Sequence, residues 1–312
     1  MIEQIKPRRL ERGHRIGIVS PSYWMDDAQW VCAQSLFEQR GYELVPGQTQ
    51  GLRDFRYAGS PEQRARDIMA MFRDPTIDAI ICARGGYGVN RVLPLLDFED
   101  IRSHPKIFVG YSDITALLLS FAQNCGLTAF HGPMLSSCGR PCDEYNFQTL
   151  EAVLSGRGDI RIAGTPGCRP RVLRAGKATG QLWGGNLSLI NERLGTRDQI
   201  DARGRILFIE EIGEKLHAFD RMLLHLRACG KFDQVAGLVV GELVEMDEGE
   251  TPFGKSTDDI VLDVFGDLDI PIVSNFPCGH GHCQATMPVA HEAELRAEAD
   301  EAWIHLPTSP VT

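Results

Sequence analysis

The sequence predicts an α/β protein in two parts, a doubly wound parallel-sheet domain followed by a smaller α+β domain. Three observations support this prediction. The chain has 312 residues, about twice the usual length of a single domain. Apolar strand patterns alternate with amphipathic helix patterns up to about Ala152, and the composition then shifts to Gly, Arg and Pro.

The N-terminal elements follow one another in strand–helix order. Strands are expected at Arg15–Ser20, Tyr42–Val45, Asp78–Arg84 and Lys106–Gly110, and helices at Asp27–Arg40, Pro61–Phe72, Asn90–Leu96 and Asp113–Cys125. Gly41 ends the first of these helices. Because the strands are apolar throughout, they are typical of a parallel sheet covered by helices on both faces. We therefore expect a flavodoxin-like arrangement in residues 1–155.

The remaining chain is predicted to be a linker at 156–175 and a second domain at 176–312. Strands are expected at Arg205–Glu211, Val235–Leu243, Pro271–Phe276 and around Glu294–Leu306, and helices at Leu216–Gly230 and Thr257–Phe265. No internal repeat of 20 to 50 residues is visible.

The composition excludes some classes of binding partner and indicates the cellular compartment. A formal charge of −10 opposes a nucleic-acid partner. No apolar run reaches the roughly 18 to 20 residues of a membrane span, and no signal peptide is visible, so we expect a cytoplasmic protein without a membrane partner. Nine cysteines are an odd number in a long chain, which favours reduced thiols over a disulfide framework.

Ser112 follows an apolar strand and precedes a helix in the segment KIFVGYSDITALLLS. Ligands bind at this edge of α/β sheets, and the free N–H groups of a helix start favour a developing oxyanion. Ser112 is therefore a candidate nucleophile. The alternative is that Ser112 or Asp113 merely caps the helix, and the segment lacks the second glycine of a G-x-S-x-G elbow.

Two further segments follow apolar strands. The loop ARGGYG contains Arg84, Gly85 and Gly86, and its glycines would let backbone N–H groups approach a ligand, although a plain turn is the alternative. Glu210 and Glu211 end the strand RILFIEE, where alternation of side chains allows one of them to face a cleft. Surface carboxylates are the alternative there.

The tract PCGHGHC contains Cys278, His280, His282 and Cys283. These side chains are zinc ligands by type, but four ligands within six residues would crowd a tetrahedral site. A catalytic histidine and an ordinary loop are the other two interpretations.

Several segments together resemble the LD-carboxypeptidase family of serine peptidases. They are, in order, LERGHRIGIVSPS, ARGGYGVNRVLPLLDF, FVGYSDITALL, FHGPM, WGGNLSLI, ILFIEEIGEKLHAFDRMLLHL and FPCGHGHCQATMPV. The resemblance runs from about residue 6 to 306. It implies a cytoplasmic enzyme that releases terminal D-alanine from murein tetrapeptides during cell-wall recycling, without a cofactor or metal and as a homodimer.

The resemblance also implies roles for individual residues. Ser112 matches the nucleophile, Glu210 the acid and His280 the base, while Glu211 and His282 stay open as alternatives for the last two. We expect the N–H groups of Asp113 and Gly86, beside Gly85, to bind the oxyanion, and Arg84 to pair with a substrate carboxylate. Trp183 and Asn186 of WGGN are expected to line the cleft between the domains, although Trp183 suits a core equally well.

Two other functions stay open. One is a microcin C self-immunity type of peptidase, which cleaves aminoacyl–nucleotide conjugates. The other is a non-catalytic murein-peptide sensor on the same scaffold. The sequence departs from the family pattern at Ala290 and His291 and in EKLHAFD, which bears on substrate preference more than on chemistry.

Overall fold

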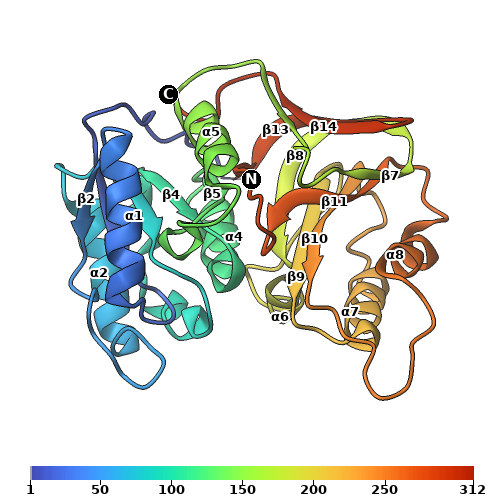
Figure 1. Cartoon of the computed structure of the whole chain (residues 1–312), viewed down its shortest axis with the longest axis horizontal. Coiled ribbons are helices and arrows are strands. Elements are labelled where there is room, and N and C mark those ends of the chain that lie inside the picture. The colour runs from blue at the N-terminus through green and yellow to red at the C-terminus, as the bar shows by residue number, and fades with distance from the viewer. Residues whose placement is uncertain (1) are drawn as a thin grey trace.

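The N-terminal half of the chain forms a six-stranded sheet, at the left of Figure 1, in the order β2-β1-β3-β4-β5-β12. The computed structural model describes residues 2–312. The strands are β1 (Arg15–Val19), β2 (Glu43–Pro46), β3 (Ala79–Cys82), β4 (Ile107–Gly110), β5 (Ala129–His131) and β12 (Met287–Val289). The first five run parallel in the order 2-1-3-4-5, so the predicted flavodoxin-like arrangement is confirmed.

The helices of this half are α1 (Asp27–Gln39), α2 (Pro61–Arg73), α3 (Phe98–Ser103), α4 (Thr115–Asn124) and α5 (Asp143–Leu154). Their starts follow local sequence chemistry: Ser60 and Gln63 form a capping box at α2, with Pro61 in the first turn. The helix expected at Asn90–Leu96 is wrong. Two short 3₁₀ helices, Val89–Arg91 and Leu93–Leu95, replace it, because Pro94 cannot donate the hydrogen bond of a helix interior.

The second half forms an eight-stranded mixed sheet in the order β6-β14-β13-β8-β9-β10-β11-β7. Its strands are β6 (Ile160–Ala163), β7 (Arg171–Arg174), β8 (Gly176–Asn186), β9 (Ile206–Ile212), β10 (Gly237–Val244), β11 (Ile272–Gly279), β13 (His291–Glu298) and β14 (Glu301–Leu306). The helices are α6 (Leu187–Glu192), α7 (Leu216–Ala228) and α8 (Thr257–Phe265). The segment 156–175, expected as a linker, thus contributes β6 and β7 to this sheet, while the domain boundaries themselves stay predictions.

The two halves of the chain are connected by a strand that crosses from one sheet to the other. β12 lies between β11 and β13 in the chain, yet it pairs antiparallel with β5 of the first sheet. The chain ends also meet, because Arg9 N–H donates to the Thr312 carbonyl and Thr312 N–H to the Pro7 carbonyl. Buried apolar side chains from both sheets form one continuous cluster. Within residues 2–312 no helix has both the length and the apolarity to cross a membrane.

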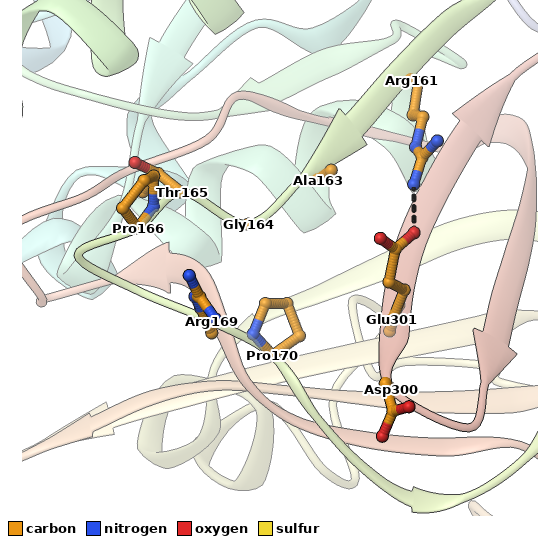
Figure 2. A pocket seen from close by; sticks show the side chains of 10 residues that line it. Arg161, Ala163, Gly164, Thr165, Pro166, Arg169, Pro170, Asp300 and Glu301 are labelled. Atoms are coloured by element: carbon orange, nitrogen blue, oxygen red, sulfur yellow. Dashed lines mark hydrogen bonds and ion pairs between the residues drawn. The ribbon is translucent and has the colours of Figure 1, made fainter.

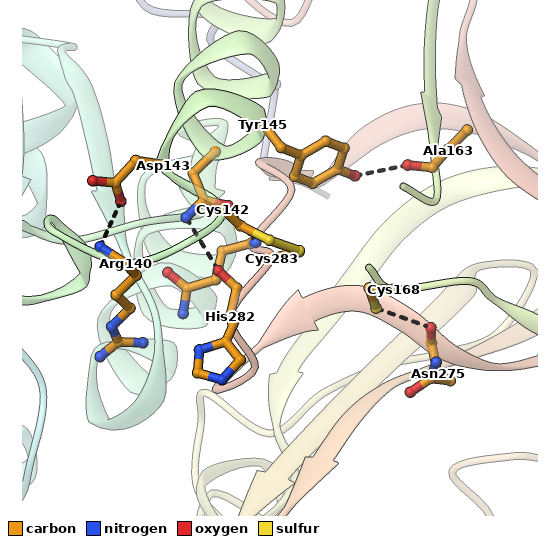
Figure 3. The surroundings of a disulfide bond; sticks show 11 residues. Arg140, Cys142, Asp143, Tyr145, Ala163, Cys168, Asn275, His282 and Cys283 are labelled. Carbon is orange, nitrogen blue, oxygen red and sulfur yellow. Dashed lines mark hydrogen bonds between the residues drawn. A yellow bond between two sulfur atoms is a disulfide. The ribbon is translucent and has the colours of Figure 1, made fainter. Parts of the chain in front are cut away.

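A disulfide joins Cys142, just before α5, to Cys283 in the loop after β11 (Figure 3). The expectation of reduced thiols throughout is therefore wrong for this pair, whose Cα atoms lie 5.1 Å apart across the junction. The other seven cysteines are free. Two segments separated by 141 residues are thus tied together next to His280.

We expect a thiol count to detect this bridge. Protein purified and denatured without reductant should titrate seven thiols, and nine after reduction. The Cys142→Ser variant has eight cysteines, one fewer than the nine of the chain, and all eight should titrate in both conditions. Nine thiols in the unreduced parent protein would contradict the bridge.

Candidate functional site

Ser112 lies in the sharp turn between β4 and α4. It opens a short 3₁₀ helix, Ser112–Ile114, and its φ is +64°, a conformation that costs a non-glycine residue about 1–2 kcal/mol. Such strain persists where the surroundings hold a residue in place, often at functional sites. The hydroxyl is hydrogen-bonded to a histidine ring from the other half of the chain, His280, and is half-buried.

His280 directly follows β11 and connects Ser112 to Glu210. Its Nε2 lies 3.0 Å from Ser112 Oγ, and its Nδ1 lies 2.6 Å from Oε2 of Glu210, a fully buried residue of β9. The three residues predicted as nucleophile, base and acid therefore form one hydrogen-bonded chain. A carboxylate at Nδ1 holds the proton there and leaves Nε2 free to accept the serine proton.

Electrostatics within this pair favour ionised Glu210. Burial alone would raise the pKa of Glu210, but the charge and hydrogen bond of His280 outweigh it and lower that pKa. Burial likewise opposes a charge on His280, yet the charge and hydrogen bond of Glu210 raise the His280 pKa above 6.5. The carboxylate thus stabilises an imidazolium, the state that His280 enters when it takes a proton.

Two glycines give these side chains the room that they need. A Cβ on Gly85 would lie 2.9 Å from the Cβ of Ser112 and 3.2 Å from its Oγ. Gly279 has a φ of +107°, and a Cβ there would lie 2.6 Å from Oε2 of Glu210. Only glycine allows this close approach in either place.

Glu211 faces the opposite side of β9, as the alternation of strand side chains predicts. Its carboxylate accepts hydrogen bonds from Ser188 N–H at 2.8 Å, Ser188 Oγ at 2.6 Å and Asn186 Nδ2 at 2.9 Å. Glu211 therefore anchors the start of α6, and the structure brings Glu210, rather than Glu211, to His280.

The WGGN motif packs the two halves together. Gly185 leaves room for Thr115 of α4, since a Cβ would lie 2.5 Å from Thr115 Cγ2, and Asn186 N–H donates to Thr115 Oγ1 at 3.0 Å. Asn186 is buried, and its side-chain amide donates to Glu211. Trp183 is also buried and lies against Arg205, whose guanidinium carbon is 4.0 Å from its ring centroid, so the structure does not bring Trp183 to Ser112.

The glycine-rich loop lies against the Ser112 turn through Asp113. The Asp113 carboxylate accepts hydrogen bonds from Ser22 Oγ at 2.6 Å and from Val89 N–H at 3.0 Å. Gly86 is exposed beside the Tyr23 ring, where a Cβ would approach within 2.4 Å. Arg84 donates weakly to the Trp24 carbonyl, at 3.4 Å. The two predicted oxyanion donors thus belong to segments in contact with each other.

His282 is exposed, and its backbone carbonyl accepts from Asn146 of α5 at 3.4 Å (Figure 3). The sulfur of Cys283 is bonded to Cys142, so one of the four donors in PCGHGHC is committed to the disulfide. Within residues 2–312 no group of three or more His, Cys, Asp or Glu side chains is arranged to hold a metal ion.

Sequence reasoning missed His131, which lies at the end of β5 behind the site. It is fully buried, and its ring stacks edge-on against Phe208 and Tyr111, with centroids at 5.3 and 6.0 Å; Tyr111 in turn contacts the His280 ring at 5.0 Å. Burial lowers the pKa of His131 to about 4, so the ring is neutral. Its place in the segment FHGPM was the available signal.

A pocket of about 410 Å³ lies elsewhere, between β6, the following loop and the β13–β14 turn (Figure 2). Arg161 and Glu301 close one side of it with an ion pair of 3.0 Å. None of the predicted site residues lines this pocket, so it has no part in the Ser112 site.

Comparison with known proteins identifies the family. Residues 16–132 match the LD-carboxypeptidase N-terminal domain and residues 179–295 the C-terminal domain. A probable murein peptide carboxypeptidase of Bacillus subtilis is 34% identical, over 96% of this chain and 94% of that protein. The microcin C7 self-immunity protein MccF of Escherichia coli is 27% identical, over 81% of this chain and 80% of that protein.

A solved structure agrees with these matches. The crystal structure of muramoyltetrapeptide carboxypeptidase from Oxalobacter formigenes superposes with a TM-score of 0.84 at 28% identity, covering 95% of this chain and 100% of that one. Both halves of the chain and their arrangement are therefore shared with a carboxypeptidase. The chain belongs to the LD-carboxypeptidase family of serine peptidases.

Proposed function

We propose that this protein is a cytoplasmic LD-carboxypeptidase that releases the terminal D-alanine from murein tetrapeptides during cell-wall recycling, and that it acts as a homodimer. The observation that carries the proposal is the hydrogen-bonded chain from Ser112 Oγ through His280 to Glu210. The murein peptide carboxypeptidase relative supports the substrate class.

In the proposed mechanism, His280 Nε2 accepts the proton of Ser112 while Oγ attacks the scissile carbonyl. Glu210 keeps the ring oriented and stabilises the imidazolium. His280 then gives the proton to the departing amine, and water hydrolyses the acyl-enzyme by the same sequence. The N–H groups of Asp113 and Gly86 are the proposed donors to the oxyanion, each worth about 10² to 10³ in rate.

A second candidate is hydrolysis of aminoacyl–nucleotide conjugates, which the similarity to MccF supports. Both candidates use the same nucleophile, so substrate comparison separates them: turnover of an aminoacyl-sulfamoyl adenosine without release of D-alanine would favour the second. A sensor without catalysis is the third. It predicts saturable binding of murein peptide together with no reaction of Ser112 with a serine-directed phosphonate.

The nucleophile is tested by Ser112→Ala. We expect D-alanine release from free murein tetrapeptide to fall at least about 10³-fold, because the attacking oxygen is removed, and EDTA to leave the parent activity unchanged. Ser103→Ala serves as the matched control, since that hydroxyl bonds to the Glu99 carbonyl on exposed α3. Release that persists in Ser112→Ala would refute the assignment.

The base is tested by the pH dependence of kcat/KM. His280 must be neutral to accept a proton, so activity should rise with pH through the His280 pKa, which Glu210 raises above 6.5. Glu210→Gln removes that charge and leaves burial, which lowers the His280 pKa. The rise of kcat/KM with pH, the acidic limb of the profile, should therefore move to lower pH, and the maximum kcat/KM should fall. An unmoved limb in this variant would argue against the pairing.

The close approach at Gly85 gives a third test. A methyl group in Gly85→Ala would press on Ser112, and a displacement of about 1 Å costs on the order of 10² in rate. We expect kcat to fall accordingly while the melting temperature changes little. Gly167→Ala is the control, because its Cβ would have no neighbour closer than 4.0 Å. Equal kcat values for the two variants would contradict the argument.

A further inference from the structure

Arg140 is a cation without a carboxylate partner beside the Ser112–His280 pair. Among residues 2–312 its side chain has no ion pair and makes one hydrogen bond, a long contact of 3.4 Å from Nη2 to the Ser136 carbonyl. The neighbouring Asp143 carboxylate is occupied by the backbone N–H groups of Gly139 and Arg140 itself. The half-buried guanidinium therefore keeps most of its donors free.

The loop that carries Arg140 is fixed around the nucleophile at three points. It leaves β5, the neighbour of β4, and Ser136 N–H donates to the Ala83 carbonyl at 2.9 Å. Ser137 Oγ contacts the hydroxyl of Tyr111, the residue before Ser112, at 3.4 Å. The disulfide then ties Cys142, two residues after Arg140, to the loop that carries His280.

Arg140 and His280 lie on the two segments that the disulfide joins, Arg140 two residues before Cys142 and His280 three residues before Cys283. Figure 3 shows the Arg140 side chain and the His282 ring both extending away from the disulfide, on the same side of it. The positive charge of Arg140 is among the groups that act on the titration of His280, where it opposes protonation. The guanidinium is therefore close enough to the imidazole for its charge to act on it.

The chemistry of the leaving group indicates what this cation could bind. In the proposed mechanism His280 protonates the departing amine, so that nitrogen must lie near Nε2. In a C-terminal amino acid the carboxylate is one carbon away from the same nitrogen. A side chain that recognises the free C-terminus must therefore lie close to His280, and a guanidinium matches a carboxylate with two parallel hydrogen bonds.

We propose that Arg140 binds the terminal carboxylate of the leaving D-amino acid and so restricts cleavage to the last peptide bond. This inference rests on the proposed carboxypeptidase function and names the residue that makes the enzyme act at chain ends. Arg84 is the other cation next to Ser112, but it lies in the loop after β3, across β4 from Arg140, and its guanidinium is directed to the Trp24 carbonyl.

The test compares the murein tetrapeptide with its C-terminal amide. We expect the parent enzyme to prefer the free carboxylate by about 10- to 100-fold in kcat/KM, the value of a hydrogen bond to a charged group. In Arg140→Gln, kcat/KM should fall by that factor on the tetrapeptide and change little on the amide. The variant should therefore no longer prefer the free carboxylate. Arg140→Lys should keep part of the preference. Arg66→Gln, a matched control on the exposed side of α2, should keep all of it.

The rate of Ser112 labelling by a serine-directed phosphonate shows whether the triad of each variant is assembled. Normal labelling of Arg140→Gln with the parent preference for the free carboxylate would overturn the inference and leave the proposed function intact. A parent enzyme that releases no D-alanine would overturn both. Loss of the preference in Arg84→Gln alone would assign the carboxylate to Arg84.

Discussion

The contact between Glu210 and His280 is the interaction on which the rest of the site depends. A carboxylate with no exposed surface is costly unless a partner compensates for its lost hydration. The imidazole Nδ1, at 2.6 Å, is that partner. The surrounding glycines follow from this pair: a side chain on Gly241 would approach Glu210 Cβ within 3.1 Å, and one on Gly279 would strike the carboxylate itself.

The site exists only where the two sheets meet. Ser112 follows β4 of the first sheet, whereas Glu210 lies in β9 and His280 directly follows β11 of the second. The His280 loop is held to α5 by the hydrogen bond from Gln284 N–H to Asn146 Oδ1, at 2.6 Å, and by the disulfide. Packing at this junction thus sets the 3.0 Å contact between serine and histidine.

Much of the first sheet could be predicted, because its strands are short apolar runs followed by amphipathic helices. The strand order agrees with that prediction. β8 was harder to recognise, since KATGQLWGGN has polar and glycine positions that look like a loop until they pair with β9 and β13. β12 was invisible for a similar reason: three residues carry no periodicity, and only long-range pairing with β5 makes them a strand.

The residues of the candidate site likewise fall into those that the sequence could predict and those that it could not. Ser112, Glu210 and His280 end or follow apolar strands and match the family motifs. The sequence left Glu211 and His282 open as alternatives, and only the structure brings Glu210 to His280. Trp183 shows where prediction from sequence fails. Adjacent residues of WGGN have different surroundings, and the sequence does not reveal which of them faces the cleft. Arg140 lies outside the segments that resemble the family, and only the fold brings it near His280.

The place of β12 bears on whether the two halves can be separated. It lies after His280 in the chain, within the C-terminal family match, yet it covers the edge of β5 in the first sheet. An N-terminal half expressed alone would expose an apolar strand edge, which invites aggregation. The halves therefore form one interlocked folding unit, and exchanging them between family members requires a matched β5–β12 pair.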